Sequence, residues 1–314
     1  MGGLRNKMVK VAYIFPGQGA QYVGMGKTLY NSFPKAKEIF DQANDILGYD
    51  IKKLCFEGPL GELSKTVNSQ PAILVHSIAA LRALEDSGKD FTPFCALGLS
   101  VGEYIALVAS GAASYKEGLK LIQQRARFME EASKQNPGKM VAVMNVELGK
   151  VEEICKEAEA EVANLNCPGQ VVVSGSPAAI NKVVALAQGK YTAKSVILNI
   201  SGAFHSSLML PAAEKLSKEI EKVNIKKPAI PMIFNATAKF ESDPAIIRKN
   251  LVTQLTKRTL WEESIKLAAQ KGVTTFLEIG PGKVLKGLMR RINPKLTVQN
   301  FDTVEDFSAV KTTA

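Results

Sequence analysis

The sequence predicts an α/β protein of two parts: a larger unit with a parallel-sheet core, and a smaller ferredoxin-like α+β unit inserted into it. Three observations predict this fold. A β-branched and aromatic run near the start ends at a Pro-Gly turn, strands and helices alternate along most of the chain, and residues 137–200 follow a βαββαβ order. The length of 314 residues suits about two units of roughly 150 residues each. We assign residues 1–136 and 201–314 to the larger unit and residues 137–200 to the smaller one.

The first part of the larger unit is predicted from apolar runs that stop at glycine or proline. Pro16-Gly17 ends the first strand, Gly88 follows a run of apolar residues at helical spacing, and Pro137-Gly138 closes a long amphipathic pattern. The predicted elements are a strand at 9–15, a helix at 70–86, a strand at 94–97, a helix from about 101 and a helix at 115–134.

The rest of the chain continues the alternation. The inserted unit is predicted as a strand at 140–146, a helix at 151–161, strands at 162–165 and 170–174, a helix at 178–188 and a strand at 195–200. The larger unit then resumes with a helix at about 207–222 and strands at 232–234, 274–279 and 297–299.

The composition, 46% hydrophobic and 22% charged, is that of an ordinary globular chain, and it excludes disordered and fibrous classes. No apolar run reaches the ~18 to 20 residues of a membrane span. Residues 1–10 lack the apolar stretch of a signal peptide, so we expect a mature chain and no membrane partner.

The net charge of +10 is spread over many helices, which favours an acidic partner or ligand over nucleic acid. Four cysteines without CxxC spacing and two histidines predict no metal or disulfide, and we expect no cofactor and a monomer.

The first candidate for chemistry is Gly98-Leu99-Ser100-Val101-Gly102, which fits the pattern G-x-S-x-G. A predicted strand leads into it and a predicted helix leaves it, as in a nucleophile elbow. The sharp turn needs glycines because the backbone crowds itself there, and it projects the Ser100 hydroxyl at a helix N-terminus that favours negative charge. We predict Ser100 as the nucleophile, with a plain Gly-Ser turn as the structural alternative.

A serine nucleophile needs a base, and only two histidines are available. His76 lies within a helical pattern and is predicted to be a packed or surface imidazole. His205 follows a strand and precedes a helix, where active-site loops emerge in α/β folds, so we favour it over a purely structural role. Between Ser100 and His205 there is no Asp, and most Glu residues lie in charged helical runs. The sequence therefore indicates a Ser-His dyad, its imidazole oriented by a group such as a backbone carbonyl.

Arg125 is predicted to project from the apolar face of its helix. The residues three and four positions away are Leu121, Ile122, Phe128 and Met129. A buried guanidinium must be paired, because an unpaired buried charge is too costly. Its partner is either a substrate carboxylate held by two hydrogen bonds or a structural salt bridge.

The Gly-rich segment at residues 16–21 follows the first strand but does not fit a dinucleotide-binding fingerprint. The third glycine of G-x-G-x-x-G would fall at Tyr22. Such a loop can instead present a backbone N–H to an oxyanion. We expect the amides of Gln18 and Val101 to form that pair of donors.

Together these motifs resemble the malonyl-CoA:acyl carrier protein transacylases, which supply malonyl groups for fatty acid synthesis. The resemblance spans nearly the whole chain and is carried by ordered segments at 15–19, 98–104, 124–125, 166–175, 202–205 and 278–282. It implies a hydrolase-like larger unit. It also assigns roles by position: Ser100 as nucleophile, His205 as base, Arg125 as carboxylate binder, Gln18 and Val101 as oxyanion donors, the Gln254 carbonyl as the group that orients the histidine, and Phe204 near the acyl α-carbon.

The resemblance implies that malonyl-CoA gives its malonyl group to the phosphopantetheine thiol of acyl carrier protein, through a serine-bound ester. The alternatives are a serine esterase or thioesterase, and a catalytically silent module that docks a carrier protein. Two positions depart from the family pattern. Many bacterial members have His where Leu99 stands and Pro where Arg258 stands. Leu99 is similar to plastid-type enzymes, so we expect the plastid stroma, with the bacterial cytoplasm and the mitochondrial matrix as alternatives.

Overall fold

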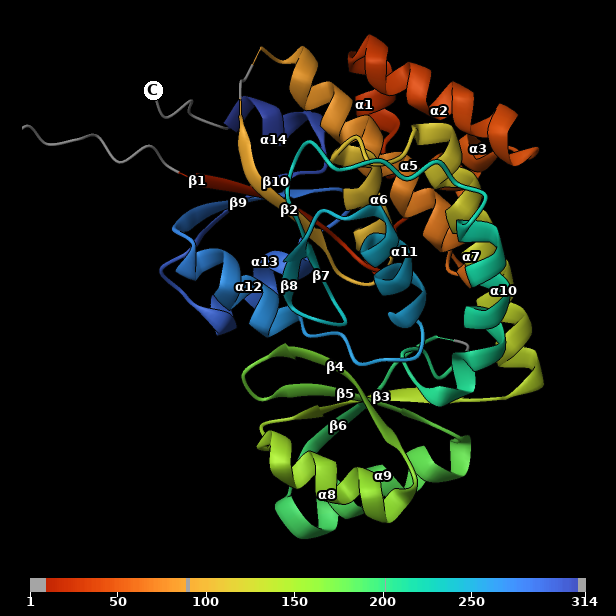
Figure 1. Ribbon diagram of the computed structural model, residues 1–314, viewed down its shortest axis with the longest axis vertical. Coiled ribbons are helices and arrows are strands. Elements are labelled where there is room, and N and C mark those ends of the chain that lie inside the picture. Colours follow the sequence, from red (N-terminus) through yellow and green to blue (C-terminus); the bar gives the residue numbers. More distant parts are fainter. Residues whose placement is uncertain (1–9, 89–90, 201, 310–314) are drawn as a thin grey trace, which may run out of the picture.

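The computed structural model describes residues 10–88, 91–200 and 202–309 and confirms the predicted fold class. Two β-sheets lie one above the other in Figure 1, each with its own helices. Val9, which we included in the first strand, and residues 1–8, for which we expected no signal peptide, lie outside the described residues. Within them, no helix has the length and apolar character to cross a membrane.

The larger sheet has six strands in the order β10-β9-β1-β2-β7-β8, parallel except at β8. The first strand, β1, lies near its centre, because its β-branched and aromatic residues suit burial on both faces. The strands are β1 (Lys10–Phe15), β2 (Pro93–Gly98), β7 (Met232–Phe234), β8 (Lys239–Glu241), β9 (Val273–Ile279) and β10 (Thr297–Phe301).

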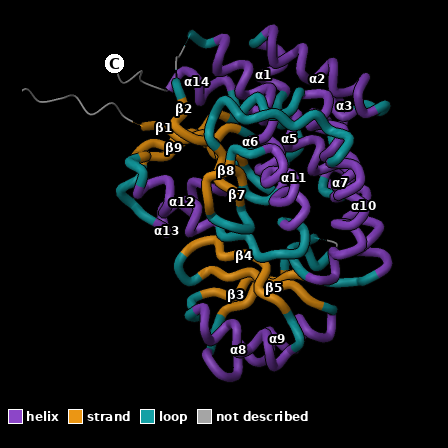
Figure 2. Tube along the Cα trace, viewed as in Figure 1, coloured by secondary structure: helices purple, strands orange, loops and turns teal. Residues whose placement is uncertain are grey.

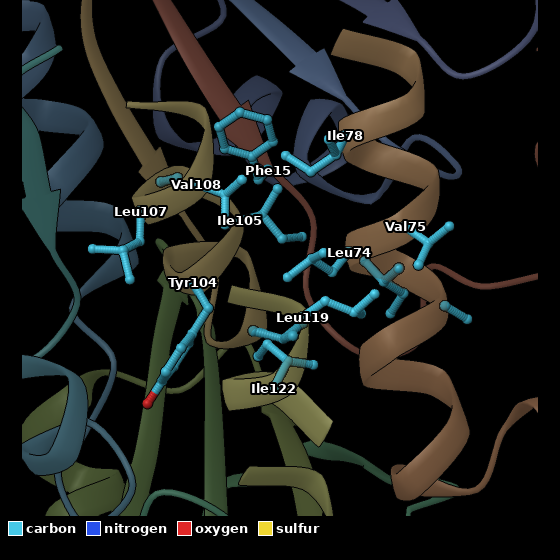
Figure 3. Packing of buried hydrophobic residues seen from close by; sticks show 14 of the residues in the cluster. Phe15, Leu74, Val75, Ile78, Tyr104, Ile105, Leu107, Val108, Leu119 and Ile122 are labelled. Atoms are coloured by element: carbon cyan, nitrogen blue, oxygen red, sulfur yellow. The ribbon is translucent and has the colours of Figure 1, made fainter. Parts of the chain in front are cut away.

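Helices cover both faces of this sheet, and the alternating side chains of β1 serve one face each. Phe15 belongs to the cluster shown in Figure 3, where it faces Ile78, Leu74 and Ile105. Ile14 belongs to the opposite cluster, with the helices near the C-terminus. The helices are α1 (Lys27–Ser32), α2 (Pro34–Leu47), α3 (Ile51–Glu57), α4 (Leu60–Leu63), α5 (Thr66–Asp86), α6 (Val101–Ala109), α7 (Tyr115–Gln135), α10 (Leu210–Ile220), α11 (Pro244–Thr253), α12 (Trp261–Gln270), α13 (Val284–Ile292) and α14 (Val304–Ala309).

The smaller sheet is antiparallel, with the order β4-β5-β3-β6 that a βαββαβ unit gives. Two helices pack on its outer face, at the bottom of Figure 1. Its elements are β3 (Lys139–Met144), α8 (Leu148–Ala158), β4 (Glu161–Cys167), β5 (Gln170–Gly175), α9 (Pro177–Tyr191) and β6 (Lys194–Ile197). Figure 2 shows this sheet separated from the larger one by loops. We retain residues 137–200 as our proposed limits of the insert.

The edge of the smaller sheet is joined to the larger unit by backbone hydrogen bonds. The amide of Leu165 donates to the carbonyl of Thr259 at 2.9 Å, and the amide of Thr259 donates to the carbonyl of Ala163 at 2.8 Å. Ser174 Oγ also donates to the carbonyl of Phe204 at 2.6 Å. The segments before α10 and α12 are therefore fixed to the insert.

Several predicted element ends differ from those of the structure. The helix predicted at 151–161 begins at Leu148 and ends at Ala158, because Glu159 adopts a left-handed conformation with φ 56°. The strand predicted to reach 146 stops before Asn145, which has φ 60°. The helix predicted from 207 begins with a 3-10 turn, η1 (Ser207–Met209), before α10.

The turn from β2 into α6 has no room for a side chain at either of its two glycines. A Cβ at Gly98 would lie 2.0 Å from the backbone carbon of Gly102, and a Cβ at Gly102 would lie 2.2 Å from the carbonyl oxygen of Phe15. Both obstacles are backbone atoms. Glycine is required here by close approach of the chain to itself.

We predict that Gly102→Ala lowers the free energy of unfolding by ~2 kcal/mol or more, because the added methyl must displace backbone. Gly287→Ala, in helix α13, is the matched control: a Cβ there meets nothing within 4 Å. It should stabilise the chain by ~0.5 to 1 kcal/mol. Urea unfolding of both variants measures the difference, and equal midpoints would contradict the crowding argument.

Candidate active site

Ser100 lies at the tip of the β2–α6 turn with φ 54° and ψ −106°, outside the regions that L-residues favour. As the N-cap of α6 it makes no side-chain capping hydrogen bond, so its hydroxyl is free for other partners. Ser100 Oγ lies 2.9 Å from His205 Nε2 and 3.2 Å from Arg125 Nη2. The hydroxyl can therefore donate to the imidazole while it accepts from the guanidinium.

His205 is the histidine that meets the serine, and its other ring nitrogen is held by backbone. Nδ1 lies 2.7 Å from the carbonyl oxygen of Gln254. A carbonyl only accepts, so Nδ1 carries the proton and Nε2 presents a lone pair to Ser100. Burial, and secondly the charge of Arg125, lower the pKa of His205 to about 4, while the Gln254 hydrogen bond acts in the opposite direction. The imidazole is thus neutral near pH 7, and its Nε2 lone pair can accept a proton.

Arg125 is completely buried on α7, as its apolar neighbours predict. Its Nη1 donates to Gln70 Oε1 at 2.6 Å and its Nη2 donates to Gln254 Oε1 at 2.9 Å. The ring of Tyr104 lies 5.1 Å from the guanidinium carbon. In the described part of the chain no carboxylate lies within 4.0 Å of this guanidinium, so the salt bridge we considered is absent there. Burial lowers the pKa of Arg125 from its usual value.

Glu103 and Asn235 complete the site, and the sequence analysis missed both. Glu103 is completely buried and accepts from Gln254 Nε2 and from the backbone amide of Asn235, each at 2.5 Å. Asn235 Oδ1 accepts from the amide of Ser100 at 2.7 Å, and its Nδ2 donates to the carbonyl of Gly98 at 2.6 Å. Glu103 could have been found as the single charged residue in the apolar helix of residues 101–109.

The two predicted oxyanion donors lie beside the elbow. A Cβ on Gly17 would be 2.8 Å from the carbonyl oxygen of Leu99, which places the loop containing Gln18 against the turn. Val101 is the first residue of α6, where an amide has no acceptor within the helix. Within the described residues neither the Gln18 amide nor the Val101 amide has a hydrogen-bond acceptor. Both are free to donate to a substrate oxygen.

The remaining candidates lie as follows. Phe204 is buried in the main core cluster directly before His205. His76 is buried on α5 and contacts Asp302 at 3.1 Å, within a cluster with Tyr22, and no contact joins it to Ser100. The four cysteines are buried free thiols, and no metal-binding group of side chains occurs among the residues described.

A groove leads from the surface to His205 between the insert and the segment after Gln254. Its volume is about 430 Å³. Lys156 and Lys257, on opposite sides, form no ion pair with any residue that the structure describes, whereas Arg258 pairs with Glu152 at 2.7 Å. The lining residues are Glu152, Cys155, Lys156, Ala160, Glu161, Val162, His205, Thr256, Lys257 and Arg258.

A strained serine, a neutral histidine and two free amides on an α/β fold are the groups that a serine-dependent acyl-group enzyme requires. The family described as acyl transferase domain matches residues 12–302. This match fixes the class of protein and spans both sheets.

The relatives are more specific. The chain is 41% identical over 306 residues to malonyl CoA-acyl carrier protein transacylase of Bacillus subtilis, covering 95% of this chain and 96% of that one. It matches the crystal structure of an acyl-carrier-protein S-malonyltransferase from Burkholderia pseudomallei with a TM-score of 0.92 and 38% identity, covering 96% and 98% of the two chains. A malonyl-transacylase solved with its type II polyketide acyl-carrier protein matches at 34% identity and a TM-score of 0.92, covering 95% and 98%. The chain belongs to the malonyl CoA-acyl carrier protein transacylase family.

We predict that neutral His205 acts as the base, so that the rate of serine acylation stays constant as pH falls from neutrality and declines only as it approaches about pH 4. The same shift lowers folding stability progressively as pH falls from the unfolded pKa of 6.5 to about 4, because in this range only the unfolded chain binds the proton. kcat/KM for acylation, measured across this range, checks the first point. A midpoint near pH 6.5 would contradict it.

Proposed function

We propose that this chain moves a malonyl group from malonyl-CoA to the phosphopantetheine thiol of acyl carrier protein, for fatty acid synthesis. One observation carries the proposal. A completely buried guanidinium, with no carboxylate at ion-pair distance in the described chain, lies 3.2 Å from the hydroxyl of a serine that contacts a neutral histidine. A donor that combines a thioester with a free carboxylate satisfies both groups at once. Membership of the family supports the same donor and acceptor.

The reaction is a double displacement that uses the dyad twice. The Ser100 hydroxyl transfers its proton to His205 Nε2 while Oγ attacks the thioester carbonyl, whose oxygen is stabilised by the amides of Gln18 and Val101. The carbon–sulfur bond breaks, and the coenzyme A thiolate takes the proton from His205. The acceptor thiol then gives its proton to His205, and its sulfur attacks the malonyl ester. The ester carbon–oxygen bond breaks, and Ser100 Oγ takes the proton back from His205, which restores the serine hydroxyl.

Arg125 is the residue we assign to donor choice. A malonyl carboxylate bound by the two terminal nitrogens of Arg125 supplies a negative counter-charge to the guanidinium. An acetyl group leaves the guanidinium without a counter-ion. Phe204 precedes His205 and is 6% exposed. We assign to its ring the crowding of a methyl branch on the acyl α-carbon. Malonyl should therefore be preferred over both acetyl and methylmalonyl.

The groove beside His205 suits the acceptor. Lys156 and Lys257 are available to the phosphate of a phosphopantetheine arm, and the net charge of +10 favours encounter with an acidic carrier protein.

Two rival functions remain testable. An esterase or thioesterase would pass the acyl group to water, and a docking module would form no acyl-enzyme; the geometry of Ser100, His205 and Arg125 favours transfer over both.

The relatives from Bacillus subtilis and Burkholderia pseudomallei are bacterial, and the plastid stroma, proposed from Leu99 alone, is our finer assignment of compartment. We also retain the proposal of a monomer.

We predict that Ser100→Ala forms no malonyl adduct with malonyl-CoA, because the attacking oxygen is removed. Intact-protein mass spectrometry after a brief exposure reports the adduct on the native chain. Addition of acyl carrier protein bearing its phosphopantetheine arm should then discharge it, while water alone should discharge it slowly. Fast loss in water would favour the esterase, and an adduct on the variant would move the nucleophile elsewhere.

We predict that Arg125→Ala lowers the malonyl-to-acetyl ratio of kcat/KM by ~10- to 100-fold, the size expected for hydrogen bonds to a charged group. Arg125→Lys keeps the charge but loses the planar fork, so malonyl transfer should fall less. Arg127→Ala is the control, since Arg127 is exposed on the same helix. Ratios unchanged in all three variants would assign Arg125 a structural role.

A further inference from the structure

We propose that Glu103 is a positioning residue for acyl transfer: its carboxylate fixes the orientation of the Gln254 side-chain amide and, through Gln254, the positions of Arg125 and His205. The inference rests on the proposed function and deepens it. It assigns a role to a completely buried acid that neither contacts the histidine nor pairs directly with the arginine.

Both carboxylate oxygens of Glu103 accept a hydrogen bond. One accepts from the Asn235 amide and the other from Gln254 Nε2, and both distances are 2.5 Å. Two donors facing two oxygens match the ionised form, which only accepts. Burial raises the pKa of Glu103, whereas the two donors and the charge of Arg125 lower it and favour the ionised form.

A helix-capping role does not explain Glu103. Ser100 and Glu103 have the S-x-x-E spacing of a capping box, in which the acid would accept from the serine amide. Here the Ser100 amide donates to Asn235 Oδ1 instead, and the Ser100 hydroxyl contacts His205. Both capping side chains are directed to other partners, so the pattern is used for the site rather than for the helix end.

The Gln254 amide lies between a group that only accepts and a group that only donates. Its Nε2 faces Glu103, and its Oε1 faces Arg125 Nη2 at 2.9 Å. In the flipped amide, the N–H groups of Gln254 would face the N–H donors of Arg125, and its oxygen would face the carboxylate oxygen of Glu103. Neither contact is a hydrogen bond, so only the observed orientation is favourable. Nε2 also donates to the Ser100 carbonyl at 3.0 Å, and the backbone carbonyl of Gln254 holds His205 Nδ1. Glu103 therefore fixes the side chain of Gln254, the residue that contacts Arg125, Ser100 and His205.

Glu103→Gln tests this role, because a neutral amide there must turn its own N–H toward one of the two donors. We expect the rate constant for Ser100 acylation, expressed per reactive serine, to fall ~10- to 100-fold, as for loss of a hydrogen bond to a charged group. The malonyl-to-acetyl ratio should fall with it. Glu278→Gln is the matched control: Glu278 is also completely buried and accepts from the amides of Leu285 and Lys286, on another helix.

The double variant, Glu103→Gln with Gln254→Glu, exchanges acceptor and donor. The new amide at position 103 can donate to the new carboxylate at position 254, whose second oxygen can pair with Arg125. Acetyl transfer should then recover toward that of the native chain, whereas malonyl transfer should not, because the new carboxylate occupies the guanidinium. A merely structural Glu103 does not predict this split, and the double variant decides the question if Glu103→Gln does not fold.

Two results would overturn the inference: a Glu103→Gln protein that differs from Glu278→Gln in melting temperature only, or a double variant without recovery of acetyl transfer. The malonyl adduct of the native chain is measured first. Its absence would overturn the proposed function and the inference together, whereas its presence with either result above would overturn the inference alone.

Discussion

The burial of one positive charge organises this site. Arg125 is completely enclosed, and removing a guanidinium from water is costly unless its hydrogen bonds are replaced. The amide oxygens of Gln70 and Gln254 replace part of the hydration, yet neither supplies a negative charge, and the Nε of Arg125 has no partner among the described residues. The protein's own groups thus compensate the guanidinium incompletely, so a carboxylate bound there would gain more than it would at the surface.

Two residues with strained backbone carry the side chains that meet beside this charge. Ser100 has φ 54° and His205 has φ 56°, values that cost a residue with a side chain ~1 to 3 kcal/mol each. The surroundings impose both conformations. Gly98 and Gly102, on either side of Ser100, pack directly against backbone, and Ser174 Oγ donates to the carbonyl of Phe204 just before His205. The strain lowers the stability of the folded chain, and it fixes the distance between the Ser100 hydroxyl and the His205 imidazole.

Local patterns were enough to predict the fold class and to single out Ser100, His205 and Arg125, because each of these residues stands in a motif or on a helix face that the neighbouring sequence defines. Asn235 gave no such signal, since its partner Ser100 lies 135 positions away and the strand before it has three residues. Glu103 was set aside with the other acids of the region, although its apolar helix marks it as buried. The helix end at Ala158 was misplaced because the left-handed residue there is Glu159, whose type does not favour that conformation.

The backbone bonds between β4 and Thr259 have a mechanical consequence. They hold the chain just beyond Gln254 to the edge of the insert, beside the groove. The same stretch of chain, a few residues earlier, supplies the carbonyl that holds His205 Nδ1. The orientation of the His205 imidazole is therefore coupled to the attachment of the insert, through the backbone between Gln254 and Thr259.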